Sequence, residues 1–351
     1  MFYLKQRLLN PLKIAPLEEK AEAYKPQYKT SGHRVLDEDR RAENVSSFVI
    51  EKLDSVIKHV QSEVKIRKVT TIEDAISILR QIEQVVTTEN FICSIPYHLI
   101  SSFSQGLMPR DIEQRLAYSS ENDLRQSHIL THAGEKFFTV DCDLSSLLYL
   151  CIGEVLNIPL RMVEVPDHNF IRWRLDDNKY VNWDTNYGFN KFTDSDYAAQ
   201  YGVTPELIVN GTFLIDLSSE NVEGYFCFIR AITFESSRAF PEAVNEYRTA
   251  IKKYPHSPAA RNNLAWLFAS NKSVHSIIAK EEALELALKA CNIHRVATNL
   301  DTLACVYAEC GNFKEAVQIE TEAFAMNPSP DYQKMIEAFQ EGKTWLDVQT
   351  N

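Results

Sequence analysis

The sequence is poor in glycine and lacks long apolar runs. Only 10 of its 351 residues are glycine, and they do not cluster. A phosphate-binding loop needs closely spaced glycines, so we expect no nucleotide cofactor. No uninterrupted apolar stretch reaches the roughly 18 residues that a membrane-spanning helix needs. Lys5, Arg7 and Lys13 interrupt the N-terminal segment, and we therefore expect no cleaved signal peptide and no membrane span.

Positive charge is also scarce. The chain has 37 Lys and Arg against 48 Asp and Glu, which gives a net charge of −11. Nucleic acids and anionic membranes bind clustered basic side chains, so we expect neither as a partner. The seven cysteines are scattered and fit no zinc-binding spacing. They predict reduced thiols in the cytoplasm and no metal, although a protein exported into a host by another signal would have the same composition.

The chain has room for about two domains, and its pattern changes along its length. Residues 1–44 are rich in proline and charge and predict an irregular segment. Apolar residues at three- and four-residue steps predict a helix from about residue 45. A second helix should open at Thr71, with Asp74 completing a capping box. Residues 91–135 have a mixed pattern that favours helix only weakly.

The stretch from Cys142 to Asp184 has a clearer pattern. Six apolar residues at helical spacing follow Cys142 and predict a helix that begins there and ends at Ile158-Pro159. Period-two runs and turn residues then predict a set of three strands. Their expected bounds are Leu160–Val165, His168–Leu175 and Tyr180–Asp184. Residues 186–221 predict a connector with short elements.

The C-terminal part is helical and repeats itself. Two groups of residues have the same spacing, each with two alanines, one larger residue between them and a final proline. They are Ala243, Tyr247, Ala250 and Pro255, and then Ala316, Glu320, Ala323 and Pro328. Between these two groups lies a middle unit that an insert around 271–280 lengthens, with Leu264, Ala265, Ala283, Ala287 and Ala290. The pattern resembles the tetratricopeptide repeat, in which small residues let paired helices approach and proline ends the second helix. It predicts an all-α domain of about three repeats over 222–345, with a generic helical bundle as the alternative.

Cys142, His168 and Asp184 are candidate catalytic residues. A cysteine at a helix start meets unpaired N–H groups and a positive dipole, which favour the thiolate and can hold an oxyanion. With a loop at residues 176–178, Asp184 faces Phe170 and lies diagonal to His168. A loop one residue earlier would put Asp184 opposite His168, and both registers keep the two side chains on one face. His168 would then take the thiol proton and Asp184 would orient the imidazole.

The segments that carry these residues are similar to the transglutaminase-like core of the compact bacterial type, which repeats of this kind often follow. The similar segments are Asp141–Leu150, Leu156–Arg161, Val165–Trp173 and Asn182–Asp184. The resemblance implies an α+β papain-like domain over 45–215. It implies a cysteine hydrolase or transamidase, acting as a protease, deamidase or cross-linker, with Cys142, His168 and Asp184 as its catalytic triad. We expect a protein or peptide substrate or partner, bound in the groove of the repeats.

Two carboxylates flank the candidate nucleophile and leave an alternative open. Asp141 or Asp143 would disfavour a thiolate if either faced the sulfur, but would have little effect if directed to solvent or capping the helix. The alternative is a catalytically inactive papain-like scaffold that acts as a protein–protein interaction module. A bacterial effector that deamidates host proteins would carry the same residues as a housekeeping enzyme. Cys142 could also be a core thiol, as we expect of Cys151.

Overall fold

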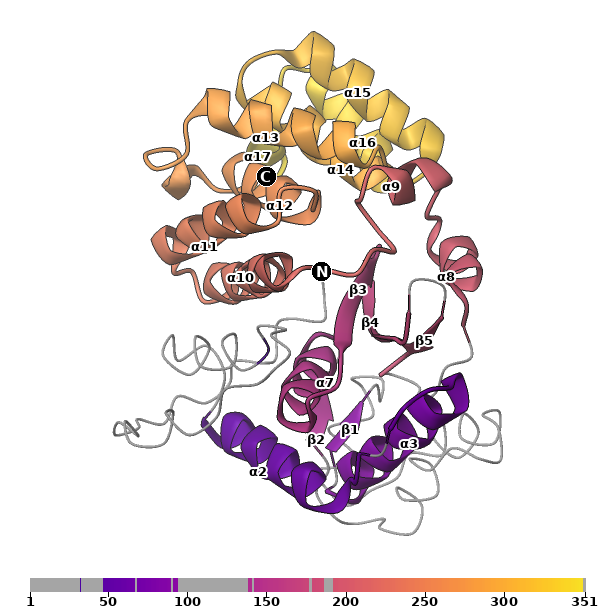
Figure 1. Cartoon of the computed structure of the whole chain (residues 1–351). Helices are drawn as coiled ribbons and strands as arrows, with labels where there is room; N and C mark the ends of the chain where they lie inside the picture. Colours follow the sequence, from indigo (N-terminus) through magenta and orange to yellow (C-terminus); the bar gives the residue numbers. More distant parts are fainter. Residues whose placement is uncertain are drawn as a thin grey trace, which may run out of the picture. The chain divides into compact units, whose positions relative to one another are not determined.

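The computed structural model describes residues 32, 47–66, 68–89, 91–93, 138–140, 142–176, 179–185 and 192–349. The segment predicted to be irregular, 1–44, lies outside these residues except for Gly32. The chain divides into two compact units (Figure 1). The first contains the described residues up to Ile208 together with Phe213–Val222, and the second contains Val209–Thr212 and the chain from Glu223 onward.

Two amphipathic helices open the described part of the first unit, namely α2 (Ser47–Glu63) and α3 (Ile72–Thr88). The predicted capping box is confirmed, because the Thr71 hydroxyl accepts from the Asp74 N–H and the Asp74 carboxylate accepts from the Thr71 N–H. Strands β1 (Phe91–Cys93) and β2 (Phe138–Val140) pair in parallel. The weak helical prediction is therefore wrong at Phe91–Cys93, and residues 94–135 lie outside the described ones.

Helix α7 (Cys142–Leu156) begins at the predicted residue. Its end is a Schellman motif. Asn157 is left-handed with φ 56°, and its N–H donates to the Glu154 carbonyl at 3.2 Å. The Ile158 N–H donates to the Gly153 carbonyl at 2.9 Å. Asparagine tolerates the left-handed region, so the helix stops just before the predicted Ile158-Pro159 signal.

The antiparallel sheet has the order β3-β4-β5. The three predicted strands are confirmed, with ends that differ by at most one residue, as β3 (Leu160–Val165), β4 (His168–Arg174) and β5 (Tyr180–Trp183). Ile171 pairs with Trp183, which is the first of the two predicted registers. Continued by one residue, this register sets Asp184 opposite Phe170. Helix α7 packs on β3 and β4, so a helix and a sheet form the α+β layer of this unit (Figure 1).

Helices α8 (Asp194–Tyr201) and α9 (Pro205–Val209) follow the sheet. A capping box between Thr193 and Asp196 starts α8, and left-handed Gly202 ends it. Helix α8 packs on β3. A small core joins the sheet to this region through Val163, Phe170 and Tyr197. The core fixes α8 beside the strand that begins with His168.

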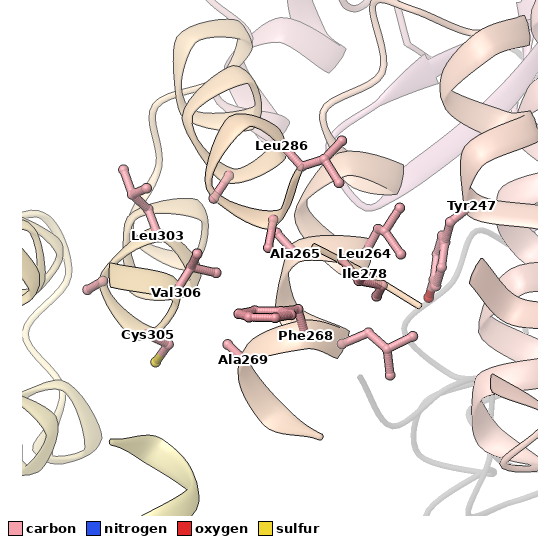
Figure 2. Packing of buried hydrophobic residues seen from close by; sticks show 14 of the residues in the cluster. Tyr247, Leu264, Ala265, Phe268, Ala269, Ile278, Leu286, Leu303, Cys305 and Val306 are labelled. Carbon is pink, nitrogen blue, oxygen red and sulfur yellow. The ribbon is translucent and has the colours of Figure 1, made fainter. Parts of the chain in front are cut away.

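Among its described residues, the second unit has helices and connecting turns and no strand. Its helices are α10 (Ser219–Ser236), which starts in the first unit, α11 (Phe240–Lys253), α12 (Ala259–Ser270), α13 (Lys280–Ile293), α14 (Ala297–Glu309), α15 (Phe313–Met326), α16 (Pro330–Gln340) and α17 (Trp345–Gln349). Helices that follow one another in sequence from α11 to α16 pack together. The insert near 271–280 forms the short 3-10 helix η1 (Lys272–Val274). Alanines of the repeated spacing are buried in a core that also contains larger side chains such as Phe268 and Leu303 (Figure 2).

The helices of the described residues include none that is both long enough and apolar enough to span a bilayer.

Candidate active site

His168 and Asp184 are held together by the β4–β5 hairpin. His168 is the first residue of β4, and Asp184 directly follows β5. The imidazole Nε2 lies 2.8 Å from Asp184 Oδ2. Both residues are buried, with 7% and 1% of their surfaces exposed, so water screens this charge-assisted hydrogen bond little. The contact predicted from the hairpin register is therefore present, whereas its catalytic role stays a prediction.

Cys142 is half-buried at the start of α7. Polar side chains tie this first turn to β4. The Asn169 amide donates to Asp143 Oδ1 at 2.8 Å, and the Ser146 hydroxyl donates to Asn169 Oδ1 at 2.6 Å. Asp143 follows Cys142 in sequence, and Asn169 follows His168. The hydrogen bond between Asp143 and Asn169 therefore brings the residue before each of them, Cys142 and His168, into the same region of the unit.

The carboxylate of Asp143 also lies close to the sulfur. The Cys142 thiol donates to Asp143 Oδ1 over 3.8 Å. Of the two orientations considered from the sequence, Asp143 thus adopts the one that faces the sulfur, because the demand of the Asn169 amide for an acceptor holds it there. Negative charge at this distance favours the thiol over the thiolate. Asp141 lies outside the described residues.

Two tyrosines of α8 complete the surroundings of the pair. The Tyr197 hydroxyl donates to Asp184 Oδ2 at 2.9 Å. The ring of Tyr201 stacks on His168, with centroids 5.4 Å apart and an interplanar angle of 15°. Sequence reasoning missed both residues. The sequence did contain a signal for them. Tyr197 and Tyr201 follow the Thr193 capping box at steps of about one helical turn, which puts both rings on one face of the helix.

Arg172 connects the sheet to the segment that follows it. Its guanidinium is buried and donates to Asn182 at 2.9 Å, to Asp194 at 2.6 Å and to Asp216 at 3.0 Å. Burial by itself would raise the pKa of Asp216. The hydrogen bond from Arg174 and the two guanidinium charges outweigh burial, so this pKa lies below its usual value. Asp194 is the first residue of α8, and Arg172 therefore fixes the start of that helix on β4.

A second buried network lies between α3, α7 and β5. Glu83 of α3 accepts a hydrogen bond from the Tyr149 hydroxyl at 2.5 Å. The Trp183 indole N–H lies 3.4 Å from the same hydroxyl. Trp173 and Trp183, considered from the sequence as possible walls of the site, are both buried in the packing of the sheet. The network therefore links α7 and the sheet to α3.

The other thiols differ from Cys142 in their surroundings. All six cysteines whose side chains the structure describes are thiols. Burial raises the pKa of Cys227 to about 12 and that of Cys291 to about 11. Cys151 is fully buried, as expected. Within the described residues, no group of three His, Cys, Asp or Glu side chains could hold a metal ion.

No protein-family model matches the chain, and no curated protein matches it.

Proposed function

We propose that the chain is a thiol-dependent hydrolase or transamidase that acts on an amide bond of a protein or peptide. Cys142 is the nucleophile, His168 the general base and Asp184 the orienting carboxylate. The observation that supports this most is the 2.8 Å hydrogen bond between the buried His168 and Asp184 side chains. A base that is itself oriented by a third group is the signature of an activated nucleophile.

The proposed reaction begins with proton transfer. His168 uses Nε2 for Asp184, so Nδ1 is the ring nitrogen that takes the Cys142 proton. The sulfur attacks the amide carbon, a C–S bond forms, and the carbonyl oxygen becomes an oxyanion. Backbone N–H groups of the first turn of α7 stabilise that charge. The C–N bond then breaks, and the nitrogen leaves with the proton from His168 as ammonia or an amine.

The thioester that remains is resolved by water or by an amine. His168 accepts a proton from the incoming molecule, a C–O or C–N bond forms, and the C–S bond breaks to return the thiol proton to sulfur. Water gives proteolysis or deamidation, and a lysine amine gives a cross-link. The three activities differ only in the leaving group and in the acceptor, so one site supports all of them.

The proposal assigns partner binding to the second unit. The repeated positions Ala243, Ala250, Ala316 and Ala323 are buried, which suits the close helix pairs of a tetratricopeptide stack. A concave face of such a stack binds an extended peptide or a helix. The first unit then corresponds to a papain-like, transglutaminase-like domain. The cytoplasm is the proposed compartment, and neither nucleic acid nor membrane is a proposed partner.

Thiol labelling tests the nucleophile. The half-buried Cys310 is the internal reference, because burial raises its pKa. We expect iodoacetamide to label Cys142 faster than Cys310 at neutral pH, as measured by peptide mass spectrometry over time. His168→Ala and Asp184→Asn should slow labelling of Cys142 and leave that of Cys310 unchanged. Equal rates at the two cysteines in the unaltered chain would contradict the proposal.

Substrate turnover is tested separately. Casein serves as a glutamine-containing probe, with ammonia release reporting deamidation, dansylcadaverine incorporation reporting transamidation and new peptides reporting proteolysis. We expect at least one signal that disappears in Cys142→Ser. Signals of equal size in both chains would show that another group is responsible.

One observation favours the inactive scaffold as a second candidate. Asp143 Oδ1 lies 3.8 Å from the Cys142 sulfur and disfavours its thiolate. Asp143→Asn removes the charge and keeps an oxygen for the Asn169 amide. If the site is an enzyme slowed by this carboxylate, the variant should label faster at Cys142 than the unaltered chain. If neither chain labels Cys142 faster than Cys310, the scaffold is the better description.

A further inference from the structure

The carboxylate of Asp184 receives two donors on the same oxygen. His168 Nε2 lies 2.8 Å and the Tyr197 hydroxyl 2.9 Å from Oδ2. We propose that Tyr197 is a positioning residue of the site: its hydroxyl fixes the Asp184 carboxylate and so holds the His168 imidazole in one orientation and one tautomer. This inference rests on the proposed function of Cys142, His168 and Asp184.

A single hydrogen bond leaves an aspartate side chain loosely defined. The last torsion of aspartate is broad, so the hydrogen bond from the imidazole leaves a carboxylate some freedom to turn about its Cβ–Cγ bond. A second donor that comes from another element removes that freedom. His168 lies on β4 and Tyr197 on α8, so the two donors reach the carboxylate from different elements. Tyr197 and Asp184 are each 1% exposed, and burial strengthens a hydrogen bond to a charged group.

Tyr197 is itself held firmly. Its ring lies parallel to that of Phe170, with centroids 4.0 Å apart and an interplanar angle of 6°. Phe170 is on the same strand as His168. The Arg172 guanidinium, also from β4, binds Asp194 at the start of α8 at 2.6 Å. One strand therefore supplies the base, the ring that supports Tyr197 and the cation that anchors its helix.

A positioning role differs from simple packing in what it changes. If the hydroxyl only stabilises the fold, its removal lowers the unfolding midpoint and leaves the pH dependence of Cys142 reactivity unchanged. If it holds Asp184, its removal weakens the support of the charged imidazole. The thiolate then forms less readily, and the profile of labelling rate against pH moves to higher pH.

The test measures the rate of iodoacetamide labelling at Cys142 against pH in the full chain and in Tyr197→Phe, which keeps the stacked ring. We expect the profile to move to higher pH and the rate at neutral pH to fall roughly ten- to a hundredfold, the factor that a lost hydrogen bond to a charged group corresponds to. Tyr254→Phe is the matched control. Tyr254 is equally buried, at 1% exposed, and donates to the Thr212 carbonyl at 3.3 Å in the second unit; its profile should stay that of the unaltered chain.

The outcomes separate this inference from the proposed function. His168→Ala is measured alongside. If it labels like the unaltered chain, the proposed function fails. If it slows labelling but folded Tyr197→Phe keeps the original rate and profile, only the role of Tyr197 is refuted. A Tyr197→Phe chain whose circular dichroism shows no fold assigns the hydroxyl to stability and also overturns the inference.

Discussion

Glu320 is an acid buried in the core of the second unit, and replacing it should change how the stability of that unit depends on pH. It lies on α15 with 0% of its surface exposed. In the repeated pattern of this unit, Glu320 takes the position that Tyr247 has in the first copy. Burial raises the pKa of Glu320 to about 9, and the negative charge of Asp301 on α14 adds to this effect. Burial likewise raises the pKa of Asp301 to about 6. Neither carboxyl oxygen of Glu320 has a hydrogen-bond partner among the described residues, so a bound proton is what removes the cost of burying its charge.

The sign of the effect follows from proton counting. Between the ordinary value of 4.5 and the folded value of about 9, the folded chain binds a proton at Glu320 that the unfolded chain has released. Stability therefore falls as pH rises through this window, by up to about 1.4 kcal/mol per pH unit. Asp301 adds a smaller slope below about 6. Glu320→Gln is neutral at every pH. The variant should lose the slope above about pH 6 and be more stable than the unaltered chain in mild alkali.

Urea unfolding followed by circular dichroism, at pH values from about 6 to about 8.5, measures this slope. The helical transition of the second unit should weaken with pH in the unaltered chain and stay level in Glu320→Gln. Glu285→Gln is the control, because Glu285 is an exposed acid on α13 whose pKa the hydrogen bond from Lys289 lowers. Its slope above about pH 6 should match that of the unaltered chain. Parallel slopes in the Glu320 variant and the unaltered chain would refute a protonated Glu320.

Three further substitutions test the packing. Thr71→Ala removes the capping box of α3 and should cost the first unit about 1 kcal/mol in urea unfolding. Tyr149→Phe takes a donor from buried Glu83 and should cost about 1–3 kcal/mol, measured in the same way; a cost near zero would mean that Glu83 finds another donor. In Gly224→Ala the new Cβ would lie 2.8 Å from the Tyr254 backbone nitrogen, so the thermal midpoint of the second unit should fall.

The parts of the fold that local sequence determines were predictable. The start of α7 and the bounds of β3, β4 and β5 follow from periodicity and from turn residues within a few positions of each boundary. The pair β1–β2 was not predictable. Its strands have three residues each and pair in parallel across a long intervening stretch, so neither an alternation pattern nor a hairpin turn marks them.

The same distinction applies to the site. The contact between His168 and Asp184 was predictable, because both belong to one hairpin and its register settles which face each side chain takes. The contacts of Tyr197 and Asp143 were not, because they depend on how α8 and α7 dock on β4. For Asp143, helix geometry alone allowed both a solvent-facing and a sulfur-facing side chain. Asn169 decides between them, since its buried amide needs the carboxylate as an acceptor and draws it to the side of the helix that carries the thiol.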